Sequence, residues 1–185
     1  MIHQQLLYLC TLPYVPPKTA SRQSNLSYLL IQRWLNMTRT LSLSDGLRAF
    51  NPPGFLMMLA EDLAASQAIV IPPNVSLVVL SGQCGFREDG TIPEDIHEQI
   101  ALAFENAERS LKAARVNPGG KNVYQMTLYY ANLNEALVAA INENKRKYLA
   151  ANRPVLTGVK VPDMYGGLSF EMTLYAYIGG KRESI

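Results

Sequence analysis

The sequence is poor in the residues that build disulfides and metal sites. Its 185 residues include only two cysteines and two histidines, which lie at widely separated positions: Cys10, Cys84, His3 and His97. Two distant thiols make neither a disulfide framework nor a zinc pattern, so we predict a reduced, intracellular protein without metal or cofactor. No apolar run approaches the ~20 residues that a membrane-spanning helix needs, so we expect no membrane association.

Acidic residues are absent from the first 44 positions, which carry four basic ones: Lys18, Arg22, Arg33 and Arg39. If residues 26–41 form an amphipathic helix, this Ser- and Arg-containing segment resembles a mitochondrial transit peptide. The alternatives are a disordered extension and a mis-assigned start codon. We therefore treat residues 1–47 as an N-terminal extension, expect a single domain over residues 48–185, and leave the location as cytoplasmic or mitochondrial.

The rest of the chain holds 13 basic and 15 acidic residues, so its body is mildly acidic. No basic patch is visible that could follow a phosphate backbone, and we expect no nucleic-acid partner. The composition, 48% hydrophobic and 17% charged, is that of a globular protein.

Hydrophobic periodicity predicts the order β-β-α-β-α-β-β. The elements are expected at residues 68–71, 77–80, 93–115, 123–130, 134–150, 155–161 and 168–178. Pro72, Pro73 and Asn74 form a turn sequence, which predicts that the first two strands make a hairpin. Each helix has one apolar stripe, so both can cover only one face of the sheet, and we expect an α+β fold. In the helix at 134–150, Lys145 and its charged neighbours are expected on the outward, solvated face.

The last strand alternates between an apolar face and a face that carries Glu171 among hydroxyl groups and two tyrosines. One interpretation is a solvent-facing glutamate on an ordinary antiparallel sheet. The other is that a second copy of the chain covers this face, with Glu171 at the edge of a pocket. Nothing else in the chain is left to cover it, which favours a symmetric homo-oligomer.

From about residue 66 to 178 the sequence resembles the Rid family of reactive-intermediate (enamine/imine) deaminases, also called RutC-like proteins. The resemblance rests on an ordered set of segments: Ser66–Val70, Ser81-Gly82-Gln83, the helix at 93–115, the strand at 123–130, Asn142, Asn152-Arg153-Pro154 and Phe170-Glu171-Met172. It implies a chorismate-mutase-like fold and a homotrimer with a small-molecule pocket in each cleft between neighbouring subunits.

The resemblance also implies roles for residues of the pocket. Glu171 matches the glutamate that positions and deprotonates the attacking water. Ser81 and Gly82 match the strand end whose backbone holds the substrate, and Asn142 matches a helix asparagine near the pocket. The segment that binds the substrate corresponds to Leu156, Thr157 and Gly158.

The sequence departs from the family where active deaminases have an arginine that binds the substrate carboxylate through two hydrogen bonds. This chain has Leu156 there, and it has Gly158 where many relatives have cysteine. Leucine cannot replace two charge-assisted hydrogen bonds, each worth ~1.5–3 kcal/mol. Together with Ala65, in place of a tyrosine, these residues predict a larger and more apolar pocket.

Two functions are compatible with these departures. The first is hydrolysis or tautomerisation of a neutral enamine, imine or similar unstable metabolite, with Glu171 as general base, in a biosynthetic pathway. The alternative is a trimeric module that binds small molecules or proteins and has lost deaminase activity, so whether the protein is an enzyme stays open. Ribonuclease activity, a third reading, is disfavoured by the charge of the body.

Overall fold

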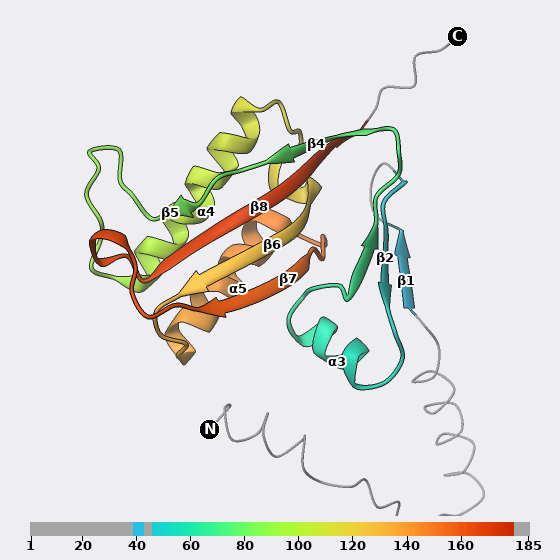
Figure 1. Cartoon of the computed structure of the whole chain (residues 1–185), viewed down its shortest axis with the longest axis horizontal. Helices are drawn as coiled ribbons and strands as arrows, with labels where there is room; N and C mark the ends of the chain where they lie inside the picture. Colours follow the sequence, from blue (N-terminus) through green and yellow to red (C-terminus); the bar gives the residue numbers. More distant parts are fainter. Residues whose placement is uncertain (1–38, 43–45, 180–185) are drawn as a thin grey trace, which may run out of the picture. The chain divides into compact units, whose positions relative to one another are not determined.

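The structure, a computed structural model, describes residues 39–42 and 46–179. These residues form two β-sheets (Figure 1). The smaller sheet has the order β1-β2-β3, made of β1 (Arg39–Ser42), β2 (Arg48–Asn51) and β3 (Ala68–Val70), all antiparallel. The helix α3 (Phe55–Asp62) connects β2 to β3.

The larger sheet carries the remaining strands: β4 (Val75–Val79), β5 (Gln83–Cys84), β6 (Val123–Tyr130), β7 (Val155–Lys160) and β8 (Phe170–Gly179). Its order is β4-β8-β6-β7, and β5 pairs with the beginning of β8. Only the β6–β7 pair is parallel among the described strands, because α5 connects those two strands. The long strand β8 lies inside the sheet, between β4 and β5 on one side and β6 on the other.

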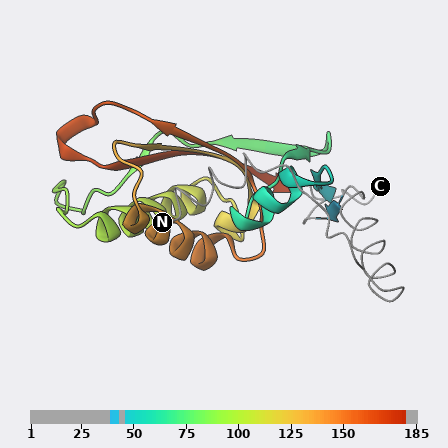
Figure 2. The ribbon, with the colours of Figure 1, turned by 90° about the horizontal axis from the view of Figure 1, so that it is seen from below.

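Two helices cover one face of the larger sheet (Figure 2): α4 (Ile96–Ala113) and α5 (Glu135–Leu149). Each helix begins at a side-chain cap. The Asp95 carboxylate accepts a hydrogen bond from the His97 amide at 3.1 Å, and the Asn134 side chain accepts one from the Leu137 amide at 2.8 Å. Helix α4 therefore begins a few residues after the predicted start at residue 93. Short 3₁₀ turns at Gly119–Asn122 and Tyr165–Gly167 precede β6 and β8.

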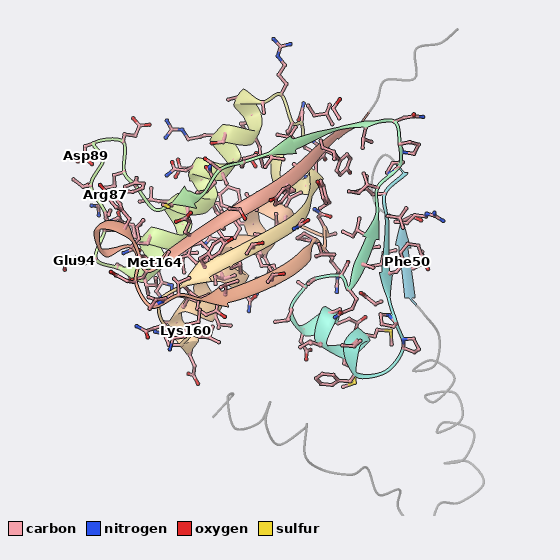
Figure 3. The ribbon with its side chains drawn as sticks, in the orientation of Figure 1. Phe50, Arg87, Asp89, Glu94, Lys160 and Met164 are labelled. Atoms are coloured by element: carbon pink, nitrogen blue, oxygen red, sulfur yellow. The ribbon has the colours of Figure 1, made fainter. Side chains whose placement is uncertain are left out.

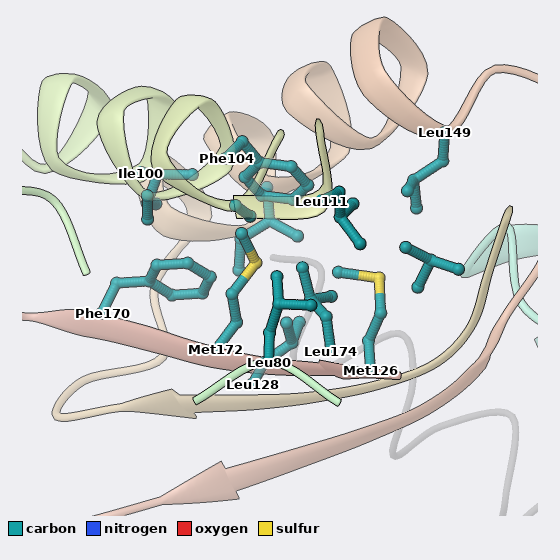
Figure 4. Close-up of a cluster of buried hydrophobic side chains, with 14 of the residues drawn as sticks. Leu80, Ile100, Phe104, Leu111, Met126, Leu128, Leu149, Phe170, Met172 and Leu174 are labelled. Atoms are coloured by element: carbon teal, nitrogen blue, oxygen red, sulfur yellow. The ribbon is translucent and has the colours of Figure 1, made fainter. Parts of the chain in front are cut away.

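The core fills the space between these helices and the sheet (Figure 4). The strands contribute Met126, Leu128, Phe170, Met172 and Leu174, and the helices contribute Ile100, Phe104, Leu111 and Leu149. The expected α+β fold, with two helices on one face of a mixed sheet, is confirmed.

Three sequence-based expectations were wrong. The first two strands form no hairpin: β3 pairs with β2, and β4 pairs with β8. Pro72 and Pro73 between them have no amide hydrogen to donate to a ladder, and the chain passes from one sheet to the other at this point. Lys145, expected on the solvated face of α5, is 4% exposed, and its amino group donates to the Leu63 carbonyl.

The third correction concerns the extension. Strand β1 lies inside the segment 1–47, so the folded part begins no later than residue 39. The last residues of the helix expected at 26–41 are in this strand, and the rest of that helix, like the targeting prediction, lies outside the described residues. No helix within the described ranges is both long and apolar enough to cross a membrane.

Candidate functional site

Glu171 lies on the face of the large sheet that α4 and α5 leave uncovered. Its neighbours along β8, Phe170 and Met172, are both fully buried in the core, so the alternation of the strand turns Glu171 to the opposite face. The side chain is half-buried between two neighbouring strands, opposite Tyr129 of β6 and Cys84 of β5. We call this surface, the face of the sheet opposite the helices, the open face.

The backbone of Gly82 approaches the Glu171 carboxylate more closely than a residue with a side chain at this position could. A Cβ atom at Gly82 would lie 1.9 Å from Oε1 and 2.8 Å from Cδ of Glu171. Distances of this kind are excluded by atomic radii, so only glycine lets the backbone approach this carboxylate. Ser81, the preceding residue, is exposed in the same connection between β4 and β5.

The short strand β5 is held in place by α4. The Asn106 amide group donates hydrogen bonds to the carbonyls of Cys84 and Phe86, both at 3.0 Å. Ser110 donates to the buried side chain of Gln83 at 3.2 Å. Since β5 is paired with β8 on its other side, these contacts fix the distance between Cys84 and Glu171. The loop that follows β5 carries Arg87 and Asp89 away from the core (Figure 3).

Cys84 is a free cysteine that lies directly opposite Glu171 in the antiparallel β5–β8 pair. Burial first, and then the negative charge and the hydrogen bond of Glu171, raise the pKa of this thiol to about 12. The thiol is therefore protonated at neutral pH and is a donor rather than a nucleophile. Sequence reasoning missed this residue, because a strand of two residues gives no periodic signal.

The predicted substrate-binding segment of β7 is divided between the two faces of the sheet. Leu156 pairs with Met126 and Gly158 with Leu128, both core residues, so these positions lie on the helix side. Thr157, which pairs with Thr127, lies on the open face. Leu156 packs against the core cluster.

The residues expected to enlarge the pocket do not open a space within one chain. The Tyr130 hydroxyl would lie 3.1 Å from a Cβ atom at Gly158, so the tyrosine already fills the volume that a side chain there would take. Ala65 is buried, and its amide donates to the Ala60 carbonyl at 2.8 Å. Asn142 belongs to α5 and so lies on the helix side of the sheet. The structure therefore brings Glu171 together with Gly82 but not with Asn142, Leu156 or Gly158.

The described residues contain no group of three or more His, Cys, Asp or Glu side chains that could bind a metal ion together. They also contain no ion pair to Glu171. The ion pairs among the described residues are Arg87–Glu98, Arg109–Glu88 and Lys112–Glu108. The site thus offers a carboxylate, a thiol donor, a close backbone segment and tyrosine and threonine side chains, without a cation.

The model of the endoribonuclease L-PSP family matches residues 64–178, which include all the strands and helices of the larger sheet. The chain belongs to this family, the Rid family. The match begins after β1, β2 and α3, so most of the small sheet is an addition before the family's segment. No curated protein matches the sequence.

Solved structures of Rid proteins are similar to this chain. RidA from the Antarctic bacterium Psychrobacter sp. is 28% identical, with a TM-score of 0.51 over 61% of this chain and 87% of RidA. TdcF of E. coli, solved with bound serine, is 25% identical, with a TM-score of 0.50 over 63% of this chain and 94% of TdcF. The Rid family protein YyfB from Yersinia pestis, 20% identical, shares the fold with a TM-score of 0.59 over 71% of this chain and 98% of YyfB.

Proposed function

We propose that this Rid protein hydrolyses a neutral imine or enamine, with Glu171 as the general base. The observation that supports this most is the placement of one carboxylate, held between Gly82 and Cys84, on a sheet face with no helix over it. A carboxylate that is held by its neighbours and forms no ion pair with a described residue is suited to accept a proton from water.

The reaction would proceed in two steps. Glu171 accepts a proton from water while the water oxygen forms a bond to the imine carbon; the electrons of the C=N bond move to nitrogen, which takes that proton from Glu171 and gives the carbinolamine. Glu171 then accepts the hydroxyl proton of the carbinolamine and passes it to nitrogen, as the C=O double bond forms, the C–N bond breaks and ammonia leaves. The products are a carbonyl compound and ammonia, and no oxidant or metal is required.

The substrate is proposed to lack a carboxylate group. TdcF, a relative of this chain, binds serine, which carries one. Here the position of the family's carboxylate-binding arginine is Leu156, and the described residues provide no cation beside Glu171. An acid substrate would therefore place a second negative charge near Glu171 without compensation.

We further propose that the chain is a homotrimer in which the open face is covered by neighbouring copies. Two apolar side chains of β4 lie on this face and are unusually exposed, Leu77 at 56% and Val79 at 64%. An exposed apolar surface of this kind is typical of an interaction site. The edge strand β7 of one copy would then border the open face of the next and complete a pocket to which Glu171 belongs.

The proposal is tested with two imines that oxidases generate in situ. Benzylamine and an amine oxidase supply an imine without a carboxylate, and alanine and an amino-acid oxidase supply 2-iminopropionate. Semicarbazide traps the free imine, so a hydrolase lowers the yield of semicarbazone. We expect acceleration with the first imine, little with the second, and loss of the effect in Glu171→Gln. Preference for 2-iminopropionate would contradict the assignment of a neutral substrate.

The alternative function, binding without catalysis, is favoured by one observation. The Tyr130 side chain occupies the space beside Gly158, and Leu156 is packed against the core, so β7 offers little room for a substrate within one chain. If neither imine is hydrolysed faster than in buffer, but native mass spectrometry of the protein from its source shows a retained small molecule, the binding function is the correct one.

A further inference from the structure

Cys84 and Glu171 face each other across the β5–β8 pair. They are directly opposite in the antiparallel register, where Cβ atoms lie ~4.5–5.5 Å apart. Because Glu171 is on the open face, Cys84 is on that face too, and each side chain is partly exposed. The thiol and the carboxylate are therefore direct neighbours at the surface where the proposed reaction takes place.

The surroundings leave the thiol one chemical role. Cys84 forms no disulfide, and its pKa, raised to about 12 mainly by burial, keeps it protonated at neutral pH. A protonated thiol is a weak donor and a poor nucleophile. The carboxylate directly opposite the thiol is that of Glu171, while Asn106 and Ser110 of α4 hold the backbone and the neighbouring side chain of β5. The Cys84 thiol is thus on a strand, β5, whose position relative to Glu171 is fixed by its neighbours.

The carboxylate of Glu171 is restricted from two directions. The backbone of Gly82 lies against Oε1, and the Cys84 thiol lies opposite on the paired strand. A glutamate without such contacts would rotate among several orientations, because its terminal torsion is broad. Catalysis by a general base depends on a fixed orientation toward the water that it deprotonates.

We propose that Cys84 is a positioning residue of this site: its thiol donates a hydrogen bond to the Glu171 carboxylate and holds that carboxylate in the orientation needed to accept a proton from water. The inference rests on the function proposed above. It adds a residue that does not touch the reacting atoms but sets the geometry of the one that does.

The pairing is tested without any substrate, by the rate at which iodoacetamide alkylates Cys84. Cys10 is replaced by serine so that Cys84 is the only cysteine in the chain. Between pH 7 and 10 the rate should rise roughly tenfold per pH unit without a plateau, since only the thiolate reacts. In Glu171→Gln the negative charge is lost, and we expect the rate at each pH to be at least about tenfold higher. Thr173→Val, on the same face two residues away, is the matched control and should resemble the parent.

The shape of the pH profile separates charge from access, because a change in access alters the rate equally at every pH. A profile with a plateau near pH 8 or 9 in the parent protein would overturn the pairing. An identical profile in the parent and in Glu171→Gln would overturn it as well.

The positioning role is tested by turnover of the benzylamine-derived imine. Cys84→Ser keeps a donor of similar size and should retain kcat within about threefold, whereas Cys84→Val removes the donor and should lower kcat by roughly tenfold to a hundredfold with little change in KM. Full activity of Cys84→Val, with Glu171→Gln inactive, would overturn the positioning role and leave the proposed function intact. If Glu171→Gln is as active as the parent, or the parent is inactive, the proposed function fails and the positioning role with it, although the alkylation profile still decides whether the pair exists.

Discussion

The two faces of the larger sheet are built from the same strands and differ in almost every property. On the helix side, Met126, Phe170 and Met172 are fully buried under α4 and α5. On the open face, Leu77 and Val79 are more than half exposed, and Glu171 is partly so. The strand alternation places these opposite environments one residue apart along β8.

This difference separates the residues that stabilise the fold from those that are available for chemistry. Burial of apolar side chains on the helix side contributes to the free energy of folding, and the open face contributes mainly through the buried cluster of Leu47, Tyr124 and Tyr177. Substitutions on the two faces should therefore have different consequences. A substitution on the helix side should lower stability, and one on the open face should reduce assembly or ligand turnover.

The largest expected effect is on the helix side, in Phe170→Ala. Removal of a fully buried aromatic side chain should lower the free energy of unfolding by about 3–5 kcal/mol, because apolar contacts are lost and a cavity remains. Thr173→Ala, three residues further on the open face of the same strand, should change it by about 0.5 kcal/mol or less. Urea denaturation followed by circular dichroism measures both. Equal losses would show that the open face is as tightly packed as the core.

The contrast between the faces was predictable from the sequence, because alternation along 168–178 and the apolar stripes of the two helices are local signals. The bounds of β6 and the cap of α5 follow from equally local patterns. The fold class and the position of Glu171 relative to the core could therefore be predicted.

Pairing between distant segments could not be predicted in the same way. The small sheet joins β2 to β3 across α3, and β5 is too short to show a period, so neither its pairing with β8 nor the Cys84–Glu171 contact is visible in the sequence. The side of the sheet on which Leu156 lies depends on the register with β6. The family resemblance supplied Glu171 and Gly82, but it had no counterpart for Cys84.

Lys145 is the only charged residue among the buried side chains of the described residues, and it predicts a pH-dependent stability. Burial, and secondly the charge of Arg153, lower its pKa from 10.5 to about 8. Between these pH values the unfolded chain binds a proton that the folded chain does not, so stability should rise with pH in this window. The full difference corresponds to about 3 kcal/mol.

The measurement is the free energy of unfolding from pH 7 to 10.5 in the parent and in Lys145→Met. The difference between them isolates this lysine, because the Cys84 thiol, with a pKa raised from 9.0 to about 12, contributes the opposite slope above pH 9 in both proteins. A parent curve parallel to that of Lys145→Met would show that the lysine is charged and solvated in the folded chain.

Gly82→Ala should affect function more than stability. The new methyl group would collide with the end of the flexible Glu171 side chain, which can rotate away, so we expect a loss of about 1 kcal/mol or less. The displaced carboxylate should lower imine turnover on the order of a hundredfold. If the glycine acts through Glu171, the double variant Gly82→Ala/Glu171→Gln will be no less active than Glu171→Gln, whereas independent, additive losses would contradict this.

The smallest effect on the stability of the chain, and the sharpest test of the open face, is expected for Val79→Lys. Val79 is 64% exposed, so a lysine can reach solvent in the isolated chain and should change the free energy of unfolding by about 0.5 kcal/mol at most. In a trimer that buries this face, three lysines would lose their hydration, and the assembly should dissociate. Sedimentation velocity distinguishes trimer from monomer, and circular dichroism shows whether the fold is retained. Val138→Lys, on an exposed apolar position of α5 at 39%, is the matched control on the helix side and should remain trimeric. Two outcomes would contradict this: a monomeric parent protein, or a trimer that Val138→Lys dissociates but Val79→Lys does not. Either would mean that the open face is solvated and that Glu171 lies on a surface rather than in a cleft.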